Sequence, residues 1–191
     1  RAECRDDEVH VADGNGNAAN SVVAAHGLPN LHAYELDASN PALLEAHLRE
    51  HPADTIISSL PFYCNVKVAE IARKVNAHYF DLTEDVPTTQ HIRGLAETSK
   101  GIMAPQGGLA PGFVGIVGAR LAEMFDKVRS IRLRVGALPQ NPTGLLGYAF
   151  NWSPEGVVNE YLNDCEVIEE GVHKIVSAME WIETIYIDGV H

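Results

Sequence analysis

Cysteine is scarce in this sequence. Three cysteines occur among 191 residues, at Cys4, Cys64 and Cys165. Their odd number and wide spacing exclude a disulfide framework and a cysteine-based metal knuckle, so they indicate a reducing compartment, which we expect to be the cytoplasm. The nine histidines also lack metal-ligand spacing, and no metal site is predicted.

Positive charge is scarce as well. Lys and Arg number 14 against 26 Asp and Glu, which gives a formal net charge of −12. This balance argues against nucleic acid as a partner, because phosphate contacts need clustered Lys and Arg. No apolar run reaches the roughly 18 to 20 residues needed to span a bilayer, and no signal peptide precedes the first expected strand. We therefore expect no membrane partner.

An alternation of apolar strands and helices fills the first part of the chain. Strands are expected at 8–13, 31–36, 54–60, 78–82 and 102–104, and helices at 18–26, 41–50, 65–76 and 88–100. This β-α-β-α order predicts a parallel sheet covered by helices on both faces. With 46% hydrophobic residues, the chain has ample apolar material for a core.

The stretch 101–125 combines a short strand, a turn dense in Gly and Pro, and an apolar helix. Gly107 and Gly108 suit a tight turn, and Pro111 suits the first turn of a helix. Three further glycines at roughly helical spacing leave one side of that helix almost bare: Gly112, Gly115 and Gly118. Either a ligand approaches this face at the carboxyl end of a strand, or the helix packs tightly on the sheet.

After residue 125 the pattern changes to mixed strands and helix. The segment 128–135 alternates apolar residues with Arg and predicts a strand with one wet face. Ser153, Pro154 and Glu155 open a helix that runs to about Leu162. Further strands are expected at 165–168, 172–176 and 181–187, with a hairpin turn at Glu170-Gly171.

The run from Gly14 to Ala19 fits G-x-G-x-x-A between a strand and a helix. As a dinucleotide fingerprint it would pair with Asp37, about 20 residues on. The helix that follows is short, however, and Asn17 is polar where such a helix needs close packing. In the second interpretation, which we favour, Asp13 is the acid that ends the second strand of a Rossmann fold and binds the adenosine ribose.

Four stretches resemble the saccharopine dehydrogenase family, and more closely its lysine 6-dehydrogenase-like branch: 54–61, 78–82, 108–112 and 147–156. Family members begin with a β-α unit that carries GxGxxG, and their second strand ends in an acid, as Asp13 does here. The resemblance thus implies a fragment that lacks this N-terminal unit and the C-terminus, consistent with a start at Arg1.

The resemblance implies an α/β fold with two parts. A truncated Rossmann domain, which is a doubly wound parallel sheet, would occupy 1–125, and part of a mixed α+β catalytic and dimerisation domain would occupy 126–191. The implied protein is a homodimer that uses NAD, with NADP possible, and takes a small amino acid as substrate.

The implied activity is NAD(P)-linked oxidation of an amino acid at a C–N bond. Fungal saccharopine reductases carry Asp where this chain has Ala110 and Cys where it has Val135, and the Ala-Pro-Gly turn resembles enzymes that oxidise the ε-amine of lysine. Saccharopine dehydrogenase proper and carboxynorspermidine dehydrogenase remain alternatives within the family. A dinucleotide-binding or interaction module without turnover is the alternative from another class.

Candidate site residues follow from strand ends and from the resemblance. Catalytic candidates that could remove a proton from the substrate are Asp81, Glu84 and Tyr63. Candidates for cofactor binding are Asp13, Asp37, Ser59, Leu60, Pro61, Leu82 and Gly108. Candidates for substrate binding are Pro111, Tyr148, Asn151 and Trp152. Structural roles stay open: Glu84 and Asp85 as helix caps, Asp81 as a partner of nearby backbone amides, and Trp152 as a core anchor.

Overall fold

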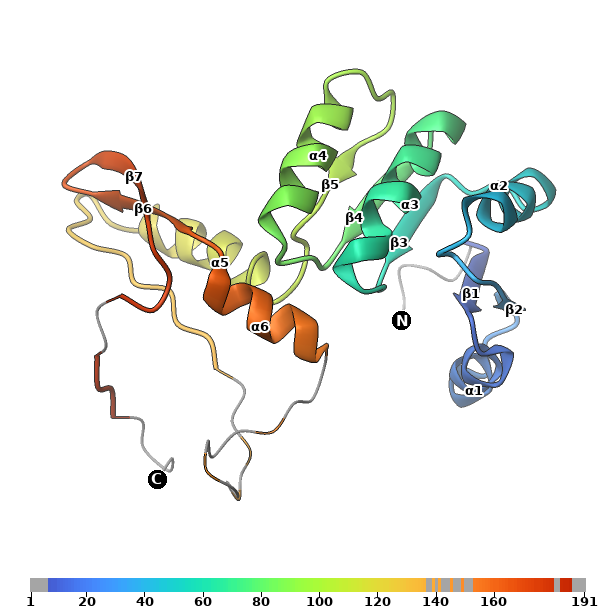
Figure 1. Cartoon of the computed structure of the whole chain (residues 1–191), viewed down its shortest axis with the longest axis horizontal. Helices are drawn as coiled ribbons and strands as arrows, with labels where there is room; N and C mark the ends of the chain where they lie inside the picture. The colour runs from blue at the N-terminus through green and yellow to red at the C-terminus, as the bar shows by residue number, and fades with distance from the viewer. Residues whose placement is uncertain are drawn as a thin grey trace. The chain divides into compact units, whose positions relative to one another are not determined.

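The computed structural model describes residues 7–136, 139, 141, 145, 149, 153–180 and 183–186 (Figure 1). The chain divides into two compact units. The first comprises Arg1–Asp81 and His91–Pro105, and the second comprises Leu82–Gln90 and Gln106–His191.

The first unit opens with a β-α-β motif whose strands are parallel. Its elements are β1 (Val9–Asp13), α1 (Gly16–His26) and β2 (Leu31–Glu35), with Asp13 opposite Glu35 in the register. Helix α1 begins two residues before the predicted start, because the side chain of Asn15 caps it by accepting a bond from the Asn17 amide at 3.0 Å. It ends at Gly27, whose φ of 60° is left-handed.

Three more parallel strands and three helices complete this part of the fold. They are α2 (Pro41–Glu50), β3 (Thr55–Ser58), α3 (Phe62–Val75), β4 (His78–Asp81), α4 (Val86–Ala96) and β5 (Met103–Ala104), with strand order β3-β4-β5. The α/β class with parallel strands is confirmed. Helix α3 starts three residues before the predicted 65, directly after Pro61, so Tyr63 lies in its first turn.

The parallel strands form two separate sheets, β1-β2 and β3-β4-β5. No strand among the described residues pairs with the outer edge of β1 or of β3. In a Rossmann sheet, the first strand lies between the second and the fourth. If β1 is the second strand of such a sheet, the break falls at the position of the first.

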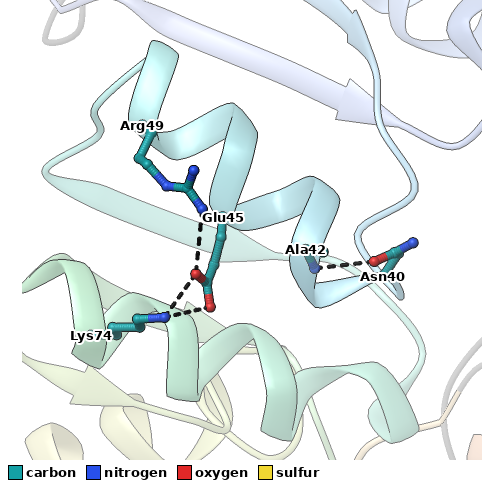
Figure 2. Close-up of polar contacts among 5 residues, drawn as sticks. All are labelled: Asn40, Ala42, Glu45, Arg49 and Lys74. Atoms are coloured by element: carbon teal, nitrogen blue, oxygen red, sulfur yellow. Dashed lines mark hydrogen bonds and ion pairs between the residues drawn. The ribbon is translucent and has the colours of Figure 1, made fainter.

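The buried core lies between α2, α3, α4 and the β3-β4-β5 sheet. It consists of Leu44, Leu48, Val68, Ala69, Ile71, Ala72, Ala77, Tyr79, Ile92 and Met103. Each large apolar side chain buried here contributes roughly 1.5–3 kcal/mol. Figure 2 shows a polar contact beside this core: the Lys74 ammonium lies 2.8 Å from both carboxylate oxygens of Glu45, and Arg49 lies 3.8 Å from one of them. Because this contact is exposed, the apolar contacts dominate the packing of α2 on α3.

The second unit contains helices and an antiparallel hairpin, as predicted. Its elements are α5 (Phe113–Ala122), α6 (Pro154–Leu162), β6 (Cys165–Glu169) and β7 (Val172–Val176). Ser153 caps α6 by accepting a bond from the Gly156 amide at 3.1 Å. The turn residues Glu170 and Gly171 have φ values of 53° and 76°, which suits a two-residue hairpin loop.

The prediction of a strand at 128–135 is wrong. This segment is exposed and has no strand assignment, because no strand among the described residues offers its backbone a ladder partner. Its arginines bind an acid instead: Arg132 and Arg134 both contact Glu183, at 3.4 and 2.7 Å. The strand predicted at 181–187 lies partly outside the described residues, and residues 183–186 are not in a strand.

The glycines of the 101–125 stretch have different surroundings. Gly112 has φ 130°, and a Cβ there would meet the backbone of Gly108. A Cβ on Gly118 would lie 2.7 Å from the side chain of Leu133, whereas a Cβ on Gly115 would meet nothing within 4 Å. Close packing therefore explains Gly112 and Gly118, and Gly115 faces open space among the described residues.

We predict opposite effects for two alanine substitutions in this stretch. Gly115→Ala should stabilise the chain by up to about 1 kcal/mol, because alanine is the better helix former and the site is open. Gly112→Ala should destabilise it by about 1–3 kcal/mol, because its φ is unfavourable for a side chain. Denaturant unfolding followed by circular dichroism measures both, and equal effects would contradict the packing explanation.

Candidate functional site: strand-end loops

A polar hollow of about 450 Å³ opens at the turn between β1 and α1. Its lining consists of Gly14, Asn15, Gly16, Asn17, Asn20 and Glu35. The hollow directly follows Asp13 in the chain, and one Asp13 oxygen accepts a bond from the Asn15 amide at 2.7 Å. The second glycine of the G-x-G-x-x-A run gives Glu35 room, because a Cβ on Gly16 would lie 2.7 Å from Glu35 Oε2.

This hollow fits the ribose of a dinucleotide better than a phosphate. Carboxylates and amides match ribose hydroxyl groups, and an acid at this strand end is the usual ribose partner. The lining contains no Lys or Arg that would neutralise a phosphate. Asp37 follows β2, and its Oδ1 accepts bonds from the backbone amide and hydroxyl of Ser39, at 3.0 and 2.5 Å.

The next candidate residues lie where β3 leads into α3. The carboxyl end of β3 is followed directly by Ser59, Leu60 and Pro61, as predicted. Ser59 and Leu60 are exposed, and Pro61 is half-buried. Tyr63, a catalytic candidate, is 66% exposed in the first turn of α3.

Asp81 ends β4 in a fully buried position. Its Oδ2 accepts a bond of 2.8 Å from the Tyr79 hydroxyl, and both side chains have 0% exposure. Burial raises the pKa of Tyr79 well above its usual range, and the negative charge of Asp81 raises it further. The phenol is therefore a fixed neutral donor, and this contact gives Asp81 a structural partner.

In the second unit, the loop after β4 is tied to α6. Asp85 Oδ2 accepts a 2.8 Å bond from the Thr88 amide and so caps α4, which confirms the capping alternative for this residue. Its other oxygen accepts a 2.8 Å bond from the Asn159 side chain on α6. Sequence analysis missed Asn159, because 74 positions separate it from Asp85.

Glu84, on the same loop, is half-buried and has an acidic neighbour on α6. Burial raises the pKa of Glu160, and the charge of Glu84 raises it further. Sequence analysis also missed Glu160, since no local pattern links it to the β4 loop. The second unit thus brings a predicted catalytic candidate and an unpredicted carboxyl into electrostatic contact.

Gly108 and Leu82 also come together in the second unit. A Cβ on Gly108 would lie 3.5 Å from the Leu82 carbonyl oxygen and 3.3 Å from the Pro111 carbonyl oxygen. The Phe113 amide donates to the Gly108 carbonyl at 2.8 Å, which fixes the turn before α5. Pro111 precedes the helix by two residues instead of lying in its first turn.

Three substrate-binding candidates, Tyr148, Asn151 and Trp152, lie outside the described residues. In the part of the chain that the structure describes, no group of three or more His, Cys, Asp or Glu side chains has the geometry to hold a metal ion. Within the same ranges, each helix is too short or too polar to cross a bilayer.

Parallel β-α units with an acid at a strand end are features of Rossmann-like α/β proteins. Within this class, residues 2–104 match the saccharopine dehydrogenase NADP binding domain, and residues 108–190 match the saccharopine dehydrogenase C-terminal domain. The chain belongs to the saccharopine dehydrogenase family. The matched domain supports NAD(P) as the cofactor, and its description favours NADP over the NAD that Asp13 predicts.

Two relatives extend this result. Saccharopine dehydrogenase [NADP(+), L-glutamate-forming] of Schizosaccharomyces pombe is 27% identical over 165 residues, which span 83% of this chain and 36% of the relative. Apo saccharopine dehydrogenase (L-Glu forming) of Saccharomyces cerevisiae has a similar fold, with a TM-score of 0.60 and 22% identity over 90% of this chain and 39% of that one. The chain therefore spans little more than a third of these relatives, which fits the predicted fragment.

We predict that Tyr79→Phe destabilises the chain by about 1–3 kcal/mol, because Asp81 loses its buried donor. Tyr63→Phe is the matched control and should change the free energy of unfolding by less than about 0.5 kcal/mol, since this hydroxyl is exposed. The raised pKa of Tyr79 adds a pH signature: its contribution is complete below about pH 10, the pKa of the unfolded state, and is lost as the pH rises further. Denaturant unfolding at several pH values tests this, and a Tyr79→Phe variant as stable as Tyr63→Phe would contradict it.

Proposed function

We propose that this chain is part of an NAD(P)-dependent oxidoreductase that acts on a C–N bond of an amino acid. The observation that carries the proposal is the match of residues 2–104 to an NADP binding domain, together with the acid-lined polar hollow at the end of β1. The match of residues 108–190 to the C-terminal domain of the same family supports an enzyme over a module that binds without turnover.

Free lysine is the substrate we favour, with oxidation at the ε-amine. The support is the Ala110 and Val135 pair, since neither residue can supply the acid/base or thiol group of the fungal saccharopine reductases. Saccharopine itself is the second candidate, because the curated relative from Schizosaccharomyces pombe is a saccharopine dehydrogenase. Carboxynorspermidine is a third candidate within the family.

Asp13 and the hollow beside it would hold the adenosine end of the cofactor. At the carboxyl end of β3, the cofactor would contact Ser59, Leu60 and Pro61. The whole protein would be a homodimer, as the family resemblance implies. When bound, NAD(P) would accept a hydride from the carbon that bears the amine.

Glu84 is the residue we assign to proton removal from the substrate ammonium, whose pKa is about 10.4. The support is that Asp81 is fully buried and already bonded by Tyr79, whereas Glu84 is half-buried. Glu84 also has an acidic neighbour on α6, because its charge raises the pKa of Glu160.

We predict that the 191-residue chain binds NAD and NADP weakly, with dissociation constants above the micromolar range. The pyrophosphate of a Rossmann ligand binds backbone amides of a glycine loop at a helix N-terminus, and the expected loop precedes β1. A version extended upstream by about one β-α unit should bind both and reduce one of them with lysine. Calorimetry measures binding, and absorbance of the reduced cofactor measures turnover.

Two results would contradict the proposal. Micromolar binding by the 191-residue chain would make Gly14, Gly16 and Asp37 the cofactor site. Binding by the extended version without turnover on lysine, saccharopine or carboxynorspermidine would favour the non-catalytic module.

We predict that Asp13→Ala shifts the cofactor preference from NAD towards NADP. A carboxylate at this position binds both ribose hydroxyls of NAD and repels the additional phosphate of NADP. In the extended version, Asp13→Ala should weaken NAD by about tenfold and leave NADP unchanged or tighter. Asp37→Ala is the comparison variant, because Asp37 is the ribose acid in the alternative interpretation. Equal weakening of both cofactors by Asp13→Ala would remove Asp13 from the ribose site.

A further inference from the structure

A cluster of imidazole and phenol rings lies where α2 meets the β1-β2 sheet. We call it the histidine cluster, and it consists of His10 on β1, His32 and Tyr34 on β2, His47 on α2, and His51 at the C-terminus of α2. The ring centroids of His47 and His51 are 4.9 Å apart, and the His10 centroid lies 5.9 and 5.4 Å from them. Tyr34 packs 4.7–4.8 Å from His47, His51 and His10.

These rings join two parts of the first unit. No residue of β1 or β2 belongs to the buried core cluster, and the two strands pair with no other strand among the described residues. Helix α2, by contrast, has a second attachment. Its Leu44 and Leu48 are buried in the core with α3, and its Glu45 pairs with Lys74 of α3 (Figure 2).

The cluster holds more groups that become cationic on protonation than it holds carboxylates. The side chains that face it from β1, β2 and α2 are the four histidines, the neutral Tyr34 and two carboxylates. Glu8 lies 3.8 Å from His32, and Glu50 lies 4.0 Å from His51. Both carboxylates are exposed, with side-chain exposures of 76% and 80%. Water therefore screens the compensation that they offer.

Protonation of two members of this cluster, His10 and His47, is less favourable in the folded state. Burial lowers the pKa of His10 and of His47, and the charge of His51 lowers both further. A histidine whose pKa is lower in the folded than in the unfolded state stabilises the fold above about pH 6.5, and this contribution is lost as the pH falls. The attachment of α2 to α3 behaves differently, because Lys74 lowers the pKa of Glu45 and apolar contacts do not titrate.

We propose that the histidine cluster is an acid-sensitive joint: below about pH 6, its charged imidazoles separate the β1-β2 sheet from α2, while α2 stays packed on α3. The joint rests on ring contacts at 4.7–5.9 Å, and no residue within β1 or β2 adds to the buried core, although Leu36, directly after β2, packs against it. Because Asp13 and the polar hollow belong to the same β1-α1-β2 motif as His10, acid would move them together away from α2.

Hydrogen exchange of the 191-residue chain tests this joint at about pH 7.5 and about pH 5.5, after correction for intrinsic exchange rates. Acid should lower the protection of β1 and β2 amides on the order of tenfold, the effect of repulsion between charges at such separations. The amides of α3 and β4 should keep their protection. An equal loss in α3 and β4 would overturn the proposal, because it would indicate unfolding of the whole unit.

Paired variants identify the groups responsible. His47→Gln with His51→Gln removes two charges and should reduce the acid response of β1 and β2 to less than about twofold. His26→Gln, at the exposed C-terminal end of α1, is the matched control and should keep the full response. His10→Phe keeps a ring at the centre, so it should lose the response even if the double variant is loosely packed at neutral pH. A full response in His10→Phe would overturn the proposal.

Discussion

A strand in a parallel sheet can pair at both of its edges, because its backbone N–H and C=O groups point outward in both directions. In the first unit the described strands pair within two sheets, β1-β2 and β3-β4-β5, and no described strand joins them. The connection between the sheets therefore depends on the chain after β2 and on side chains.

The two faces of α2 illustrate two kinds of attachment. Toward α3 it contributes Leu44 and Leu48 to an apolar core, and burial of such side chains is nearly independent of pH. Toward β1 and β2 it contributes imidazoles, whose packing depends on their neutral form. One helix thus links a core whose packing is nearly independent of pH to a sheet whose position depends on histidine protonation.

Local patterns predicted most elements and several loop positions well. The cap at Ser153 and the Glu170-Gly171 turn each depend on neighbouring residues, so the sequence predicts them directly. The strand at 128–135 failed for the opposite reason. Alternation of apolar and Arg residues specifies a face, but a strand also needs a partner with which to exchange hydrogen bonds.

By itself, the sequence determined the α/β class, most of the elements, the family and the position of Asp13 at a strand end, because these depend on short-range patterns. The tertiary structure alone decided which distant polar groups meet: Asp85 with Asn159, Glu84 with Glu160, and three histidines around Tyr34. Burial and charge at these places come from residues far apart in the chain. No periodicity within one element encodes such contacts, since they arise only when the elements pack.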